Sequence, residues 1–179
     1  MIITPEIRKY WEAVGTRIRD IRKEKGKTQA EMAIGANQLE SAVNQFENGI
    51  RSTSINYALY LRNEYGASFD WIYDGETILK AHKPQSLRCK VLDPVAIGAR
   101  IKELRQSLGL NRVEFGKMVG LRCAYISIYE IGTVKPRIET AKMIKKTTKK
   151  HLDWIYFGDE VIIPKSVIRA QKAKSAKSK

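Results

Sequence analysis

The chain repeats its own sequence pattern at a fixed interval. Residues 14–77 align with residues 97–160 without a gap, and the segment DWIY at 70–73 returns at 153–156. The identical residues fall at expected helix ends and core positions, as an internal structural repeat requires. A chain of 179 residues with 43% hydrophobic content is long enough for two small cores. We therefore expect one small fold, built twice.

Each copy contains a sequence signal for the start of a helix. Thr28 stands three residues before Glu31, and Asn111 stands three residues before Glu114. At this spacing the first side chain accepts from the amide of the second residue, while the carboxylate accepts from the amide of the first. A helix is predicted to begin at each of these places.

Each of these helices is followed by a turn and a second short helix. Asn37 and Gly120 are residue types that tolerate the left-handed backbone of a sharp turn. Gly49 and Gly132 can end the second helix in a left-handed cap. Two helices that cross at such a turn form a helix-turn-helix, whose second helix can enter the major groove of DNA.

The remaining pattern adds one helix before this motif and two after it. Apolar residues at helical spacing predict a helix from about Pro5 or Glu12 to Lys25, and further helices near Ile55 and over 68–75. The predicted fold class is all-α, with two tandem five-helix domains. The predicted ranges are 1–77 for the first domain, 78–95 for a linker, 96–163 for the second domain and 164–179 for a basic, disordered tail.

The positive charge is divided unevenly between the copies. The net charge is +14 and the pI is about 9.8, which favours a polyanionic partner, nucleic acid ahead of an acidic membrane surface. Residues 14–77 hold eight Lys and Arg residues against nine Asp and Glu residues, whereas residues 97–160 hold thirteen against seven. Most phosphate attraction is expected in the second copy and the tail. Within the second copy, the lysines between Lys145 and Lys150 are interpreted either as a solvated surface or as a phosphate-facing one.

Several other classes of protein are disfavoured. Cys89 and Cys123 are too few for a disulfide framework, and no Cys/His cluster has zinc spacing. We find no apolar run of about 18 residues and no signal segment, so we expect a soluble, cytoplasmic protein that is nucleoid-associated when bound. His82 and His151 are isolated, and no catalytic constellation appears. We expect no enzyme activity, no metal and no cofactor.

The segments TQAEMA, SAVNQFENG and DWIYDGE resemble the lambda-repressor-like, Cro-type (XRE) helix-turn-helix family, and the resemblance covers 14–77 and 97–160. It implies a pair of DNA-binding domains in which the third helix of each reads bases. The predicted DNA-binding residues of the first copy are Thr28, Gln29, Glu40, Ser41, Asn44, Gln45 and Arg51. Those of the second copy are Asn111, Arg112, Arg122, Cys123, Ala124, Tyr125, Ser127, Lys135 and Arg137.

The resemblance also assigns roles within this set. Gln29 and Arg112 match the position that contacts a phosphate at the start of the second helix. The pairs Arg22 with Glu47 and Arg105 with Glu130 match an ion pair that ties the first helix to the third.

Three positions depart from the family pattern. Leu39 replaces a hydroxyl cap, Glu40 places a negative charge near the groove, and Ile128 replaces a polar reader. Glu can accept from cytosine N4, and apolar side chains can contact the thymine methyl group. These departures therefore change the expected binding site.

Two functional hypotheses follow. The first is a sequence-specific transcription regulator that binds double-stranded DNA, with the two copies reading adjacent major grooves as a covalent pseudo-dimer. The alternative is a protein-interaction regulator of the anti-activator or antitoxin type. In it, the acidic first copy, with Leu39, Glu40 and Ile50 exposed, binds a protein partner or a second chain, and only the second copy and the tail bind DNA.

Overall fold

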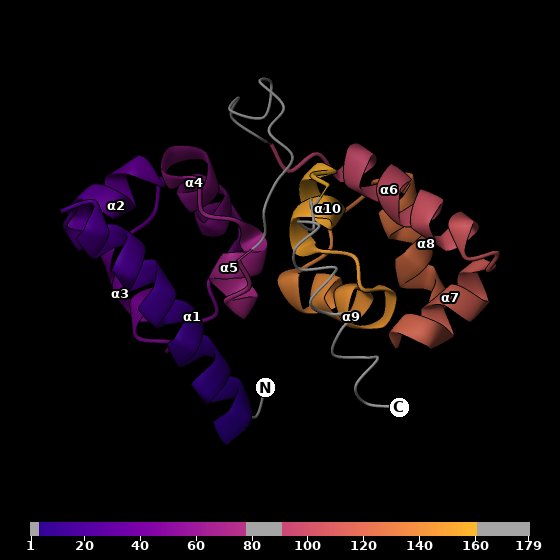
Figure 1. Ribbon diagram of the computed structural model, residues 1–179, viewed down its shortest axis with the longest axis horizontal. Helices are drawn as coiled ribbons and strands as arrows, with labels where there is room; N and C mark the ends of the chain where they lie inside the picture. The colour runs from indigo at the N-terminus through magenta and orange to yellow at the C-terminus, as the bar shows by residue number, and fades with distance from the viewer. Residues whose placement is uncertain (1–3, 78–90, 161–179) are drawn as a thin grey trace, which may run out of the picture.

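The computed structural model describes residues 4–77 and 91–160, which form α-helices and contain no strand (Figure 1). The predicted all-α class is therefore confirmed for this part of the chain. The helices before the gap are α1 (Pro5–Glu24), α2 (Gln29–Gly35), α3 (Glu40–Glu47), α4 (Ile55–Tyr65) and α5 (Phe69–Asp74). Those after it are α6 (Pro94–Ser107), α7 (Arg112–Val119), α8 (Cys123–Ile131), α9 (Ile138–Thr148) and α10 (Leu152–Phe157).

The predicted capping boxes are present in α2 and α7. The Glu31 amide donates to the Thr28 hydroxyl over 3.1 Å, and the Thr28 amide donates to the Glu31 carboxylate over 2.8 Å. Asn111 and Glu114 make the same exchange at the start of α7. The turns that follow use left-handed backbone at Asn37 (φ 49°) and Gly120 (φ 75°). Local sequence thus determines both ends of α2 and α7, the first helix of each predicted helix-turn-helix.

The helix before each motif packs directly on the backbone of the helix after the turn. A Cβ atom added to Gly15 of α1 would lie 2.5 Å from the carbonyl oxygens of Phe46 and Glu47 in α3. A Cβ atom added to Gly98 of α6 would lie 2.1 Å from the carbonyl oxygen of Tyr129 in α8. Only glycine permits this approach, which holds α3 and α8 close to α1 and α6.

The second set of helices begins earlier than the sequence indicated. Helix α6 starts at Pro94, inside the range 78–95 assigned to the linker, because Asp93 caps it by accepting from the Val95 amide over 2.9 Å. Proline is favoured in the first turn of a helix, where its missing N–H costs nothing. The rest of the predicted linker up to residue 90, the end of the second domain at 161–163 and the predicted tail at 164–179 lie outside the described residues.

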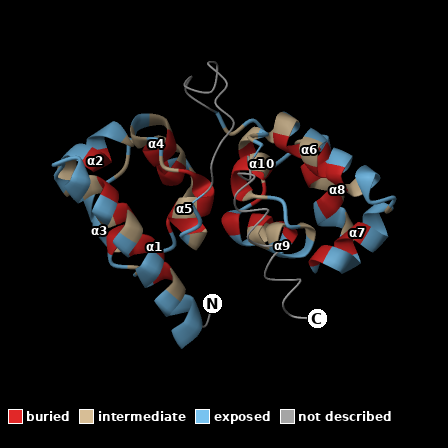
Figure 2. Ribbon diagram, viewed as in Figure 1, coloured by how far each residue is buried: buried red, intermediate tan, exposed pale blue. Residues whose placement is uncertain are grey.

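Helices α1 to α5, the N-terminal half, meet helices α6 to α10, the C-terminal half, where α5 faces α10 (Figure 1). The view shows α4 on the upper side of its half and α9 on the lower side of the other, as in a two-fold related pair. The buried residues of both halves form one cluster, and buried segments of α5 and α10 face each other (Figure 2). The two halves therefore share a core.

Two buried aspartates exchange hydrogen bonds across this contact. The amides of Leu152 and Asp153, at the start of α10, donate to the two carboxylate oxygens of Asp70, each over 2.9 Å. In return, the amide of Phe69, at the start of α5, donates to the Asp153 carboxylate over 2.9 Å. Each aspartate of the repeated DWIY segment thus satisfies backbone donors at the first turn of the opposite helix.

Candidate nucleic-acid interface

Helices α3 and α8 are the two helices that the sequence predicts to read bases. Leu39 precedes α3 and Arg122 precedes α8, and neither caps its helix with a side-chain hydrogen bond. The first amides of both helices are therefore not satisfied by their N-cap side chains, and a phosphate oxygen is a suitable acceptor for such groups.

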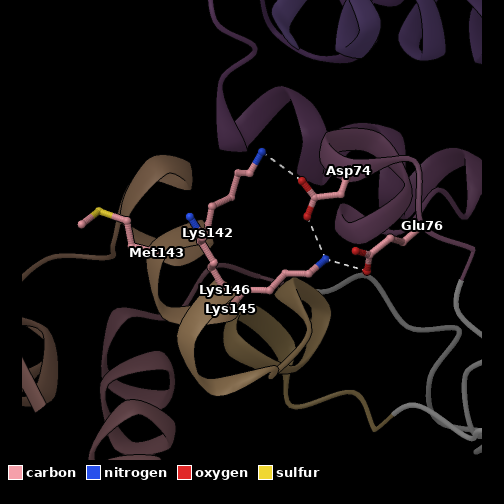
Figure 3. A pocket seen from close by; sticks show the side chains of 6 residues that line it. All are labelled: Asp74, Glu76, Lys142, Met143, Lys145 and Lys146. Atoms are coloured by element: carbon pink, nitrogen blue, oxygen red, sulfur yellow. Dashed lines mark hydrogen bonds and ion pairs between the residues drawn. The ribbon is translucent and has the colours of Figure 1, made fainter. Parts of the chain in front are cut away.

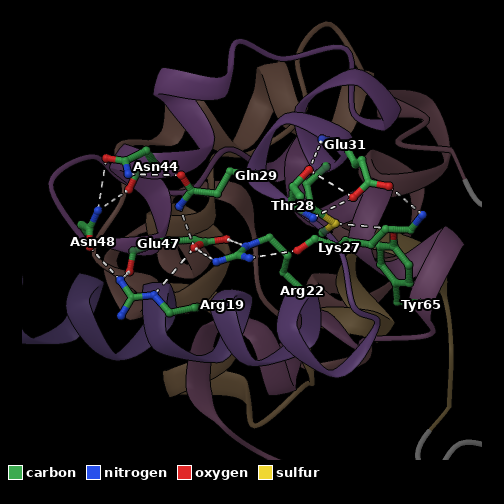
Figure 4. A network of polar contacts seen from close by, with 11 residues as sticks. Arg19, Arg22, Lys27, Thr28, Gln29, Glu31, Asn44, Glu47, Asn48 and Tyr65 are labelled. Carbon is green, nitrogen blue, oxygen red and sulfur yellow. Dashed lines mark hydrogen bonds and ion pairs between the residues drawn. The ribbon is translucent and has the colours of Figure 1, made fainter.

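In the N-terminal half, buried Glu47 organises the polar groups beside α3 (Figure 4). Arg22 donates to both of its carboxylate oxygens, over 2.6 and 2.9 Å, which confirms the predicted pairing of the first helix with the third. Gln29 donates to the same carboxylate over 2.9 Å and accepts from Asn44 over 3.2 Å. Both polar atoms of the Gln29 amide therefore have partners within the protein.

In the C-terminal half, Glu130 takes the place of Glu47, and two arginines donate hydrogen bonds to it instead of one arginine and one glutamine. Arg105 donates to its two oxygens over 2.5 and 3.2 Å, as predicted, and Arg112 donates through Nε over 2.8 Å. The Arg112 side chain is 42% exposed, whereas that of Glu130 is 1% exposed. Arg112 is thus anchored at its inner edge and presents its guanidinium to solvent, which is suitable geometry for a phosphate contact.

The titration of both glutamates reflects these partners. Burial raises the pKa of Glu47, but the hydrogen bonds and charges of Arg22, Gln29 and Arg19 outweigh burial and bring the pKa below its usual value. For Glu130, burial again raises the pKa, and Arg105 and Arg112 lower it below its usual value. Both carboxylates are therefore ionised at neutral pH.

Most predicted contact residues of the N-terminal half lie at the surface. Gln29 and Gln45 are half-buried, and Arg51 lies with its guanidinium carbon 5.9 Å from the centre of the Phe46 ring. Those that are exposed are Thr28, Glu40, Ser41, Asn44 and Arg51. Of these, Asn44 is already bonded to Gln29 and accepts from Asn48 over 3.2 Å.

The predicted contact residues of the C-terminal half are also mainly exposed. These are Asn111, Arg112, Arg122, Ala124, Tyr125 and Arg137, whereas Cys123, Ser127 and Lys135 are half-buried. Tyr125 stacks on Tyr129 with ring centres 6.5 Å apart. Lys135, assigned by sequence to the phosphate-binding loop, donates to Asn56 of the other half over 3.1 Å. Lys135 therefore also links the two halves.

The two halves place exposed apolar residues at different positions around the motif, and the C-terminal half exposes Val113 and Ile131. Ile34, Leu39 and Ile50 are 80%, 74% and 65% exposed in the N-terminal half. The sequence places Lys117, Arg122 and Thr133 at the matching positions of the C-terminal half. The N-terminal half thus presents apolar groups at three places where the other half has groups that can hydrogen-bond to DNA.

The interpretation of the lysine run in α9 as a solvated or phosphate-facing surface is wrong for Lys145. Its side chain is 13% exposed, and its ammonium lies 2.7 Å from carboxylate oxygens of Asp70, Asp74 and Glu76 in the other half. Figure 3 shows its contacts with Asp74 and Glu76. Burial lowers the pKa of Lys145, but these three carboxylates outweigh burial and raise it above its usual value. Part of the positive charge in the C-terminal half therefore binds the acidic N-terminal half.

The same place contains the one group of possible metal ligands among the described residues. Asp70, Glu76 and His151 have ligand atoms within 4.8 Å of one another. The Lys145 ammonium is bonded to both carboxylates, so a cation already occupies this position. The group is best explained as an ion-pair network.

The contact between the halves through Lys145 and the carboxylates around it was not predicted from sequence, although the sequence contains a signal for it. Arg62 and Lys145 occupy matching positions of the two copies, as do Glu76 and Asp159. Basic and acidic residues that recur around a repeated Asp-Trp segment predict a contact between the copies. Recognising it requires knowing that the repeats pair face to face.

Comparison with known proteins gives one informative result. A helix-turn-helix family model matches residues 101–155, from within α6 into α10. Neither curated proteins nor solved structures give a match. Among the described residues, no helix is both long and apolar enough to span a membrane. The match covers α7 and α8, so in the C-terminal half a helix-turn-helix family model spans both helices of the predicted motif.

Proposed function

We propose that this protein is a sequence-specific transcription regulator in which α3 and α8 read adjacent major grooves of double-stranded DNA. The observation that carries this proposal is the two-fold-like pairing of the halves through α5 and α10 (Figure 1). A paired arrangement presents two reading helices to one side of a duplex at a fixed separation, as in dimeric regulators of this class. Here a single chain supplies both helices.

The two reading surfaces differ, so the preferred DNA site has two unlike halves. Asn44 of α3 offers an amide that can pair with adenine, and Arg122 before α8 offers a guanidinium that can pair with guanine. Arg112 and Arg137 supply phosphate contacts beside α8, and Arg51 supplies one beside α3.

Selection of binding sites from a random DNA library by the full chain tests this proposal. We expect a site with two unlike halves, in which Arg122→Ala relaxes the sequence preference in one half and Asn44→Ala relaxes it in the other. Full-length variants are required, because separate fragments would expose the shared core around Phe69 and Tyr156. Selection of a perfect inverted repeat would contradict the pseudo-dimer.

A second function is favoured by the exposed apolar residues of the N-terminal half. In this alternative, Ile34, Leu39 and Ile50 form part of a surface for a protein partner, and only the C-terminal half binds DNA. The bonding of Gln29 within the protein agrees with it, since Glu47 and Asn44 hold that amide against the protein and use one of its two N–H donors. A selected site with a single half, unaffected by Asn44→Ala, would favour this alternative.

A further inference from the structure

The contact between the halves is a set of reciprocal interactions that the repeat places in register. Asp70 caps α10, and Asp153 caps α5. Arg62 of α4 forms ion pairs with Asp153 and Asp159, while Lys145 of α9 forms them with Asp70 and Glu76. These six residues, with Phe69 and Tyr156, are called the joint.

The centre of the joint is buried, which limits the freedom of the halves to separate. Asp70 and Asp153 are fully buried, and Arg62 is 8% exposed. The rings of Phe69 and Tyr156 lie 5.2 Å apart, one from each half. Separating the halves would leave carboxylates and helix amides without their partners, in addition to exposing aromatic surface.

The ion pairs of the joint also favour pairing of unlike halves. Lys142 of α9 also lies 3.0 Å from Asp74, and this ion pair has no counterpart in the opposite direction. The matching positions of the repeat hold uncharged Leu59 and Phe157. Arg62 instead lies over the Phe157 ring, with its guanidinium carbon 4.0 Å from the ring centre. The acidic edge of α5 therefore matches the basic face of α9 (Figure 3).

We propose that the joint, and not the length of the connecting segment, sets the spacing between the two DNA half-sites. Asp70 and Asp153 act as positioning residues, since they hold α5 against α10 and thereby fix α3 relative to α8. This inference rests on the proposed DNA-binding function.

The test uses the full chain and DNA duplexes in which the two selected half-sites are moved apart in single base-pair steps. We expect the wild type to bind one spacing, and to bind roughly 100-fold more weakly when the half-sites are displaced by about 5 base pairs, half a helical turn. Insertion of ten Gly and Ser residues between Lys83 and Pro84 should leave the preferred spacing unchanged.

Variants that open the joint should lose the preference for one spacing between the half-sites. In the double variant Asp70→Ala/Asp153→Ala, we expect the loss of affinity on displacing the half-sites to fall below about 10-fold, with unchanged affinity for a single half-site. Lys145→Ala should have the same effect to a smaller degree. Lys146→Ala is the matched control, because Lys146 is an exposed lysine next to Lys145 on α9. It should keep the wild-type spacing.

Amide hydrogen exchange of Phe69, Leu152 and Asp153 reports on the joint without DNA. These amides should exchange faster in the joint variants while amides inside α3 and α8 stay protected, which separates an open joint from an unfolded chain. If the insertion variant shifts its preferred spacing, or if an open joint keeps the full spacing preference, the inference is wrong. If the wild type selects no pair of half-sites, the proposed function itself fails.

Discussion

The two halves of this chain have the same order of five helices but different residues on their outer surfaces. The contacts that both halves share are those that the fold requires. In both halves a buried glutamate, Glu47 or Glu130, binds an arginine of the first helix through two hydrogen bonds. The other side chain that donates to this glutamate differs: neutral Gln29 donates to Glu47, whereas charged Arg112 donates to Glu130. The interior pairing is therefore retained, while the group nearest the proposed DNA-facing surface varies in charge.

The largest effect is expected from removing the shared glutamates. Glu47→Ala and Glu130→Ala should each lower the free energy of unfolding by about 3–5 kcal/mol, because each leaves a partly buried arginine without its partner. Chemical denaturation of both variants measures this. A loss below about 1 kcal/mol in either half would show that its ion pair is not structural.

A smaller loss of stability is expected at the closest helix contacts. Gly15→Ala and Gly98→Ala should each cost about 1–3 kcal/mol, because the new methyl group meets the backbone of α3 or α8. Gly98→Ala should cost more, since its Cβ would approach a carbonyl oxygen to 2.1 Å instead of 2.5 Å. Thermal unfolding compares the two variants with the wild type. An unchanged melting temperature in either variant would show that the two helices can move apart without loss of packing.

The features predicted from sequence depend on residues close together in the chain, whereas the missed features depend on residues far apart in it. The capping pairs Thr28 with Glu31 and Asn111 with Glu114 are local, and the turn residues act within one or two positions, so spacing alone identifies them. The all-α class follows from helical periodicity for the same reason.

The joint depends on contacts between residues far apart in sequence. Asp70 bonds to the amides of residues 152 and 153, and Lys145 bonds to carboxylates near residue 70. Helical spacing places Lys145 on the same face of α9 as buried Ile138 and Ala141, but it does not identify the carboxylates of the other half that Lys145 contacts. Composition placed positive charge in the second copy correctly, but the direction in which each lysine points is a property of the packed halves.

Acid should lower the free energy of unfolding, because it protonates partly buried carboxylates in both halves. The folded-state pKa values of Glu47, Glu130 and Asp74 lie below their usual values, with burial opposed by stronger bonds to basic or amide groups. Their contribution to stability is therefore complete above the pKa values of the unfolded chain, about 4, and is lost as pH falls through the lower folded values. Unfolding measured from pH 6 to pH 2 should show this decline, with a shallower slope in Glu47→Gln. A stability that stays constant over this range would contradict the assignment.

The smallest expected effect sharpens the comparison between Gln29 and Arg112. Arg112→Ala should weaken binding to all DNA sequences alike and reduce the salt dependence by about one unit of slope, because one phosphate contact is lost. Gln29→Ala removes no charge, so its salt dependence should match that of the wild type. Affinity measured at several salt concentrations for both variants tests this pair. A sequence-selective loss in Arg112→Ala would instead assign that arginine to base reading, and an altered slope in Gln29→Ala would show that the Glu47 network controls the charge presented to DNA.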